Sequence, residues 1–321
     1  MIKLLGFVLL IFLVNYIYSK INKRIDIHNN NKNKNLIDDY LFENKTSLSK
    51  NKNIVWVHIN YEQNSRNWIN FKSRKTFELN QPYKMITISS IINSSLNDYD
   101  VCIINDDSFK SLIPGWSIDI NNLADPIKEH MRSLALIKLM YYYGGILVPS
   151  SYLSLRPMKN LENIGLNNHN SFFVELDNKN ISSNLITSFP SHRFMGCKKE
   201  CEEIKELMLF TERLVSNDYT AEQNFLGEIN KKCYELCKKN KSFVIKSKIV
   251  GVRDIHNNYI RIEDLLGSSY IDFCDSLNGI YIPDKEILKR TKYQWFARMS
   301  EEQIYSSNMI IAKYMIVRTD Y

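Results

Sequence analysis

The chain lacks the basic stripe that marks nucleic-acid-binding proteins. Its 321 residues contain 42 Lys and Arg against 35 Asp and Glu, a formal net charge of +7, and the lysines are scattered along the whole length. Binding of a phosphate backbone requires cations gathered on one face or along one helix. The sequence also shows no internal repeat. We therefore expect neither a nucleic-acid partner nor a repeat architecture.

Residues 1–19 predict a membrane anchor. An apolar run from Leu4 to Tyr18 is broken by a single Asn and is flanked by Lys3 and Lys20. A spanning helix needs about 20 residues, with a range of roughly 17–25, so this run is long enough if the flanking lysines snorkel. The end of the run offers no small-x-small cleavage site, which favours an uncleaved anchor over a cleaved signal peptide.

Residues 20–52 are rich in Asn and Lys and poor in large apolar side chains, which is typical of a solvated stem. The basic residues after the anchor favour a cytosolic body by the positive-inside rule. The cysteines and the glycosylation sequons at Asn44, Asn93 and Asn180 favour the opposite side. We expect a single-pass membrane protein with a lumenal or extracytoplasmic body over residues 53–321, and the cytosolic orientation stays open.

Four of the six cysteines form two Cys-x-x-x-Cys pairs in segments that predict helices. Spacing of four puts both sulfurs of a pair on one face of a helix, and bridging within a helix is geometrically poor. We therefore predict two antiparallel helices joined by disulfides Cys197–Cys237 and Cys201–Cys233, in a helical insertion over about residues 197–240. A four-thiolate zinc site and unpaired buried cysteines are the alternatives.

The body predicts an α/β fold, and its 44% hydrophobic content supports a sizeable core. Apolar runs at 54–59 and 100–104 suit buried parallel strands, and a helix starting at Pro82 separates them. This order implies a right-handed crossover. A further helix leads to Gly144 and then to a third strand at 146–148.

Polar residues follow the carboxyl ends of these strands, where open α/β sheets bind their ligands. The first strand ends at His58, and the connection after it carries two arginines. We expect a ligand site there that is formed by His58, Arg66, Arg74, Asp106, Asp107, Glu129, Arg132, Ser150 and Ser151.

The run Tyr143-Gly-Gly-Ile146 resembles the signature of the DXD-motif glycosyltransferases, whose Tyr-Gly-Gly-Ile-Tyr-Leu-Asp-x-Asp segment gives two carboxylates to a diphosphate-bound metal. The resemblance covers roughly residues 54–210. It implies a Rossmann-like GT-A type nucleotide-sugar transferase fold, with Gly144 and Gly145 beside the nucleotide sugar. Glu222 and Gln223 are similar to an acceptor-side segment of related transferases, and the whole chain resembles membrane-anchored proteins of large DNA viruses.

The sequence departs from this family where the metal would bind. Pro149 and Ser151 stand at the two carboxylate positions. A neutral hydroxyl is a poor ligand for a hard cation without an anionic partner, and proline has no donor atom to offer. Glu129 and Arg132 have the chemistry of the family's Asp-x-x-Arg but lie one helical turn upstream. We therefore expect no metal cofactor, neither Mn nor Mg.

Three accounts of the function remain. Arg66, Arg74 or Arg132 could bind the diphosphate directly, which makes the protein a metal-independent transferase. A metal could move to Asp106 and Asp107 instead. Catalysis could also be lost, which leaves a carbohydrate-binding or structural protein of the same fold. We expect a membrane-anchored glycosyltransferase-like protein of the first kind, with the third as the alternative.

Overall fold

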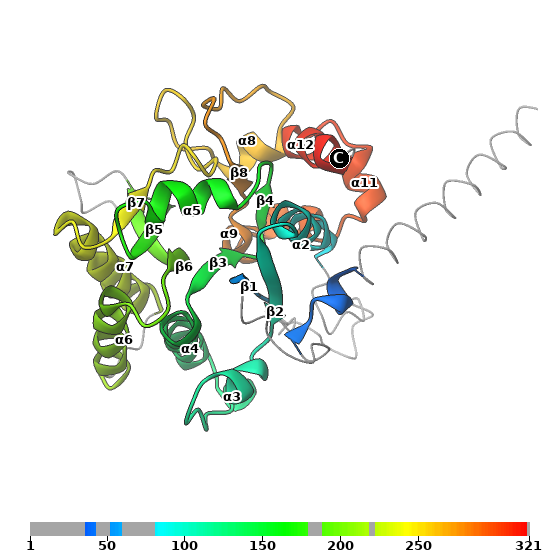
Figure 1. Cartoon of the computed structure of the whole chain (residues 1–321). Coiled ribbons are helices and arrows are strands. Elements are labelled where there is room, and N and C mark those ends of the chain that lie inside the picture. The colour runs from blue at the N-terminus through cyan, green and yellow to red at the C-terminus, as the bar shows by residue number, and fades with distance from the viewer. Residues whose placement is uncertain (1–35, 43–51, 60–80, 179–187, 218–221, 320–321) are drawn as a thin grey trace, which may run out of the picture.

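The protein, seen in a computed structural model, is described over residues 36–42, 52–59, 81–178, 188–217 and 222–319. Its central sheet has six strands in the order β2-β1-β3-β6-β5-β7. The strands are β1 Asn53–His58, β2 Tyr99–Ile104, β3 Gly145–Pro149, β5 Ser171–Asn178, β6 Ser188–Cys197 and β7 Phe243–Ile245. β1 pairs in parallel with β2 and β3, and β5 pairs in parallel with β7, whereas β6 is antiparallel to both of its neighbours. The predicted α/β class is confirmed, and this mostly parallel sheet is compatible with a Rossmann-like fold (Figure 1).

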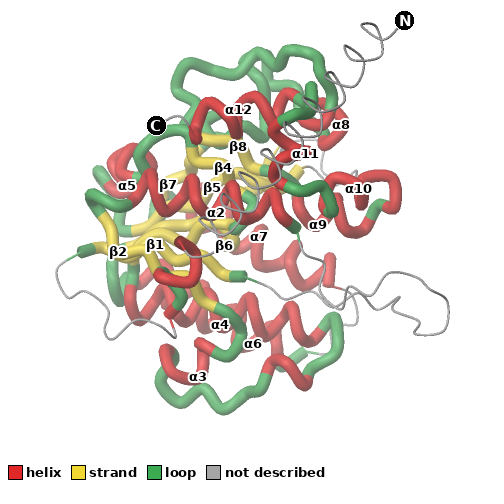
Figure 2. Tube along the Cα trace, turned by 90° about the vertical axis from the view of Figure 1, so that its right-hand side faces the viewer, coloured by secondary structure: helices red, strands yellow, loops and turns green. Residues whose placement is uncertain are grey.

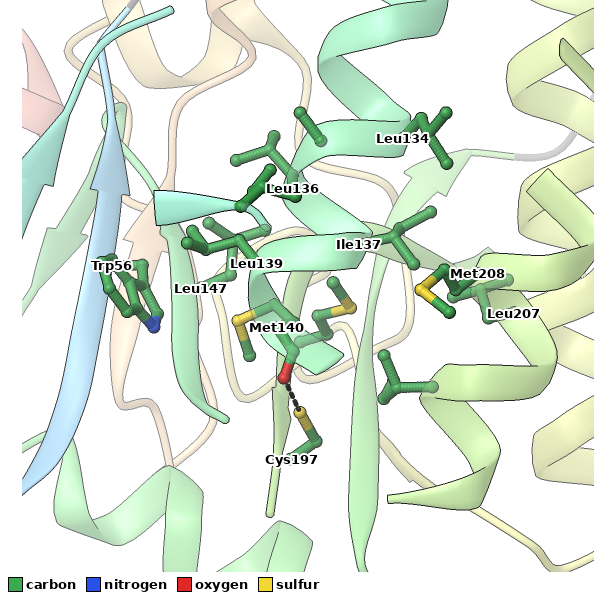
Figure 3. Close-up of a cluster of buried hydrophobic side chains, with 14 of the residues drawn as sticks. Trp56, Leu134, Leu136, Ile137, Leu139, Met140, Leu147, Cys197, Leu207 and Met208 are labelled. Carbon is green, nitrogen blue, oxygen red and sulfur yellow. Dashed lines mark hydrogen bonds between the residues drawn. The ribbon is translucent and has the colours of Figure 1, made fainter. Parts of the chain in front are cut away.

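Successive side chains of a strand point to opposite faces of the sheet, so the core has two layers, one on each face. Trp56 packs with the helices of one face, and Val55 and Val57 pack with those of the other. The first layer contains α4 Ile127–Tyr143, α6 Glu202–Val215 and α7 Glu222–Lys238, and the second contains α2 Pro82–Ser95 and α5 Lys159–Leu166. Figure 3 shows α4 between Trp56 and Met208, which belongs to α6.

A third apolar cluster lies beyond the sheet. It joins α2 to a two-stranded sheet of β4 Tyr152–Ser154 and β8 Gly279–Tyr281 and to short helices near the C-terminus. Further helices in the described part of the chain are α3 Ser108–Leu112, η3 Ile120–Asn122, α8 Ile262–Leu266, α9 Asp284–Lys289, η4 Thr291–Tyr293, α10 Gln294–Ala297, α11 Glu301–Tyr305 and α12 Ile310–Thr319. Figure 2 shows the C-terminal helices on the side of the sheet away from α4 and α6.

The two glycines after α4 allow the helix to turn directly into β3. Gly144 has φ of 68° and Gly145 has φ of 97°, values that favour glycine. A Cβ on Gly145 would lie 2.1 Å from the carbonyl oxygen of Ile54 in β1. Gly145 is therefore required for the close approach of β3 to β1.

The folded body begins earlier than the predicted boundary at residue 53. Residues 36–42 lie within the segment interpreted as a solvated stem, yet Ile37 is buried in the second core layer. Leu41 forms a parallel bridge with Ile103 at the free edge of β2. Although the sequence around this segment is polar, its apolar side chains pack against the sheet, and the segment covers the edge of β2.

No helix within the described ranges is both long and apolar enough to cross a membrane. The predicted anchor at residues 1–19 lies outside the described residues.

The two disulfides predicted for the cysteines are not formed. All six cysteines lie in described segments, and none of them takes part in a disulfide. Cys197 is the last residue of β6 and not a helical residue, whereas Cys201 precedes α6 and both Cys233 and Cys237 lie on α7. The prediction assumed that both cysteine pairs lie on helices. This assumption was wrong for Cys197, because the segment that ends at Cys197 pairs with β3 and β5 and forms a strand.

Candidate functional site

A hollow opens at the carboxyl ends of β1 and β3, where His58 and Pro149 are register partners. Its cavity volume is about 80 Å³, and it opens to solvent. We call it the carboxyl-end hollow. It is lined by His58, Lys84, Glu129, Arg132, Ser133, Leu136, Leu147, Val148, Pro149, Ser150, His192, Arg193, Tyr281, Asp284 and Lys285.

Asp106 joins β1 to α4 through a buried ion-pair network. His58 lies on the same face of β1 as Trp56, stacks on Phe109 and places its Nε2 3.0 Å from Asp106 Oδ1. Arg132 donates from Nε at 3.0 Å to both carboxylate oxygens of Asp106, and from Nη2 at 2.6 Å to Oδ2. The side chains of His58, Asp106 and Arg132 are each 8% exposed. Such charge-assisted, bidentate contacts fix the position of the Arg132 guanidinium, which lines the hollow.

Glu129 extends the network across the hollow. Its Oε1 accepts from Arg132 Nη1 at 2.6 Å and its Oε2 accepts from Lys285 Nζ at 2.9 Å. Glu129 and Arg132 reach the site despite their shift of one turn, because α4 is longer than the strand beside it. A 17-residue helix spans about 25 Å, whereas the five residues of β3 span about 17 Å. The first turns of α4 therefore extend past the end of β3.

Three further cations line the hollow, and sequence reasoning missed all of them. Lys84 of α2 donates to Asp284 at 2.9 Å, and Arg193 of β6 interacts electrostatically with the same carboxylate. Lys285 is the neighbour of Asp284 at the start of α9. These side chains come from three distant segments and belong to no motif, so the sequence offers no signal that would group them.

The acids of the site stay ionised in spite of burial. Burial acts to raise the pKa of Asp106, but hydrogen bonds from His58 and Arg132 outweigh it and lower this pKa to about 2. Burial likewise opposes ionisation of Glu129, whereas Lys285 and Arg132 lower its pKa to about 2. The pKa of Asp284 is lowered as well, by Lys84, Arg193 and Lys285 against burial. Arg132 remains a cation, because the two carboxylates raise its pKa against burial.

Acidification is expected to destabilise the protein through Asp106 and Glu129. Their folded-state pKa values of about 2 lie below the ordinary values of 3.8 for Asp and 4.5 for Glu, so their contribution is complete above these ordinary values. It is lost as the pH falls from about 4.5 toward about 2. Urea unfolding across this range should show a steep loss in the free energy of unfolding. Glu129→Gln should flatten that slope and Asp107→Asn should not; parallel wild-type and Glu129→Gln profiles would contradict the assignment.

The positions of the missing carboxylates hold no acidic group. Ser150 lines the hollow, and its carbonyl oxygen accepts from Thr87 at 2.6 Å. Ser151 is fully buried. Both oxygens of Asp106 are engaged by cations, and Asp107 is exposed and accepts from Asn121. The described residues contain no group of three His, Cys, Asp or Glu that could hold a metal. The hydrogen bonds from Arg132 to both oxygens of Asp106 are what speaks against the account that moves a metal to Asp106 and Asp107.

The remaining predicted site residues do not join this cluster. Gly144 and Gly145 lie at the amino end of β3, opposite the hollow, and their role is structural. Arg66 and Arg74 lie outside the described residues. Glu222 and Gln223 begin α7, in which Phe225 stacks on His130 of α4 with 3.8 Å between ring centroids. The predicted acceptor-side segment thus starts a helix that packs beside the first turns of α4.

Of the predicted set, four residues line the hollow: His58, Glu129, Arg132 and Ser150. Asp106 is connected to them through its contacts with His58 and Arg132. The arrangement can bind an anion, because a preorganised cluster of cations faces an open space at the ligand-binding edge of the sheet. No protein-family model matches the sequence, and no curated protein matches it. What the protein does must therefore be argued from the hollow itself.

Proposed function

We propose that the carboxyl-end hollow binds the diphosphate of a nucleotide sugar through cationic side chains, and that the protein is a metal-independent glycosyltransferase-like protein. One observation carries the proposal: Lys84, Arg132, Arg193 and Lys285 line the hollow together with Pro149. Pro149 stands at one of the two positions where the resembling family has its metal-binding carboxylates. Cations in the hollow would neutralise the departing diphosphate without a metal.

The charge balance of the cluster supports an anionic ligand. Four cations, Lys84, Arg132, Arg193 and Lys285, accompany three carboxylates, Asp106, Glu129 and Asp284, and four minus three leaves a net charge of +1 for these seven side chains. The carboxylates hold the cations in place before a ligand arrives, which reduces the ordering cost of binding. A diphosphate would contact Lys84 and Lys285 in competition with Asp284 and Glu129.

The proposal includes a GT-A type nucleotide-sugar transferase fold, and the arrangement of the sheet supports it. A mostly parallel sheet with one reversed strand next to β3, and a ligand site at the carboxyl ends, is what a GT-A type domain would provide. The proposal also includes that the chain is a single-pass membrane protein whose folded body lies on the lumenal or extracytoplasmic side. That part rests on the N-terminal sequence and the sequons alone.

A second function, binding without transfer, is favoured by a specific feature of the site. Glu129 and Asp284 are each held by a lysine, and the ion pairs lower the pKa of both. A general base should have a pKa near the working pH and should reach the acceptor hydroxyl. A protein that keeps the diphosphate site and lacks such a base would bind a nucleotide sugar or glycan as a scaffold.

Calorimetric titration of the full chain with a panel of nucleotide diphosphate sugars tests the proposal. We expect binding of at least one sugar nucleotide that is equal with Mn²⁺ and with chelator. Lys84→Gln and Arg193→Gln should each weaken it about tenfold, since a charge-assisted hydrogen bond contributes about 1.5 kcal/mol or more. Lys231→Gln, which removes an exposed cation of α7, is the matched control and should have no effect.

The outcomes separate the two functions. Binding with release of the nucleoside diphosphate in the presence of an acceptor would identify a transferase, and binding without turnover would identify the scaffold. Loss of binding on chelation would contradict the metal-independent mechanism. Absence of binding across the whole panel would overturn both functions.

A further inference from the structure

A second cavity lies at the other end of the sheet from the carboxyl-end hollow. The first residues of three neighbouring strands line it: Asn53 of β1, Tyr99 of β2 and Gly145 of β3. Side chains of α5 and of the turn after β6 complete it. We call it the amino-end cavity. Its volume is about 680 Å³, which lies within the range of roughly 300–1,000 Å³ that is typical of ligand pockets.

Glu162 of α5 is held in a fixed position at this cavity. Its Oε1 accepts from Asn53 Nδ2 at 2.8 Å, and its Oε2 accepts from the Tyr99 hydroxyl and from Lys159 Nζ at 2.9 Å. The Glu162 side chain is 12% exposed. A carboxylate offers about four acceptor positions, so three donors leave about one for a ligand. Because the carboxylate is already ordered, a ligand that binds it has a lower ordering cost.

Two amide side chains stand beside Glu162 in the lining. Asn163 and Asn167 both line the amino-end cavity, and both are exposed. They are four residues apart at the end of α5, so they lie on one face of the helix. Each amide offers donors as well as an acceptor, and a hydroxyl group also donates and accepts. This part of the lining therefore suits a ligand that is rich in hydroxyl groups.

Lysines give the amino-end cavity a positive charge. Lys198 and Lys199 line it from the turn after β6. Glu162 is the acidic residue among the described residues of its lining, and Lys159 pairs with that carboxylate. The exposed Glu200 lies 3.7 Å from Lys199. Three lysines and two glutamates leave three minus two, a net charge of +1 for these five side chains. An anionic group is therefore attracted to this side of the cavity.

A second basic turn adjoins the turn after β6. It follows α7 and carries two exposed lysines at 238–239, before Asn240. The Nε2 atom of His169 lies 3.3 Å from Asn240 Oδ1, and the next residue, Asn170, accepts from Lys198 Nζ at 3.1 Å. The two lysine-bearing turns thus contact the same loop after α5. Their convergence extends the positive charge beyond the cavity itself.

We propose that the amino-end cavity binds an acidic oligosaccharide, a ligand that combines hydroxyl groups with carboxylate or sulfate groups. Its hydroxyl groups exchange hydrogen bonds with Asn163, Asn167 and the remaining acceptor position of Glu162. Its acidic groups pair with Lys198 and Lys199. A nucleic acid fits less well, because it carries a phosphate at every nucleotide and would bring negative charge to the Glu162 carboxylate. The site is separate from the carboxyl-end hollow, so the inference does not depend on the proposed function.

Calorimetric titration of the full chain with a sulfated tetrasaccharide from heparin tests the proposal. We expect saturable binding, with at least about tenfold lower affinity for chitotetraose, which is neutral, and for inorganic tripolyphosphate, which has no sugar hydroxyls. Lys199→Gln should weaken binding of the tetrasaccharide about tenfold, because it removes a charge-assisted contact. Lys231→Gln is the matched control: Lys231 is 61% exposed and 3.9 Å from a glutamate, against 65% and 3.7 Å for Lys199.

Asn163→Leu separates the hydroxyl contacts from the charge. It should weaken binding of the sulfated tetrasaccharide about fivefold and leave the residual affinity for tripolyphosphate unchanged, whereas Lys199→Gln should weaken both. Equal affinity for tripolyphosphate or for a single-stranded oligonucleotide would overturn the proposal in favour of general polyanion binding. A loss on Lys84→Gln as large as that on Lys199→Gln would overturn it by placing the ligand in the carboxyl-end hollow. Absence of tetrasaccharide binding would overturn it and leave the nucleotide-sugar proposal standing.

Discussion

Gly145→Ala is expected to lower the free energy of unfolding by about 4 kcal/mol. Part of this loss is backbone strain, because φ of 97° is a conformation that costs a residue with a Cβ about 1–3 kcal/mol. The rest is steric, because the added Cβ would lie 2.1 Å from the carbonyl oxygen of Ile54. Relieving that overlap requires β3 to move away from β1, and such overpacking costs about 1–3 kcal/mol.

Gly227→Ala provides the matched control for this prediction. Gly227 is exposed on α7, and a Cβ there would meet nothing within 4 Å. Alanine in a helix interior stabilises by about 0.5–1 kcal/mol relative to glycine. Urea unfolding of both variants should therefore give changes of opposite sign. A Gly145→Ala variant as stable as the wild type would contradict the required close approach.

Asp106→Ala is expected to lower the free energy of unfolding by about 3 kcal/mol. Removing one partner of a buried ion pair leaves the other charge without compensation, at a cost of about 3–5 kcal/mol. We expect a cost at the lower end of this range, because Arg132 keeps its contact with Glu129 at 2.6 Å. His58 also loses the acceptor that fixes its ring.

Asp107→Ala is the control, since the neighbouring carboxylate is exposed and should contribute within about 0.5 kcal/mol. Urea unfolding at neutral pH measures both variants. Asp106→Asn, which keeps the shape of the side chain and removes its charge, separates the ionic contribution from packing. If Asp106→Ala and Asp107→Ala were equally stable, the buried network would not be a source of stability.

The two stability predictions also bear on the proposed function. Gly145 lies at the amino end of β3 and the cations lie at its carboxyl end. A destabilised Gly145→Ala protein that still folds at low temperature should therefore keep its nucleotide-sugar affinity. Asp106→Ala should lose both stability and affinity, because Asp106 orients Arg132.

Several elements could be predicted from local patterns. Continuous apolar runs at 54–59, 100–104 and 146–148 predicted β1, β2 and β3. Gly144 marked the end of α4, because a left-handed residue is needed there. These features depend on neighbours in the sequence. The strand that contains Cys197 could not be predicted in this way, because pairing with β3 and β5 outweighed the helical spacing of its cysteine.

The sequence by itself determined the α/β class, the first three strands and the absence of carboxylates at Pro149 and Ser151. Only the tertiary structure decided which cations meet, because Lys84, Arg193 and Lys285 converge through the packing of α2, β6 and α9 around one edge of the sheet. Electrostatic partners are selected by distance in space, and no spacing along the chain encodes the distance between residues 84 and 284.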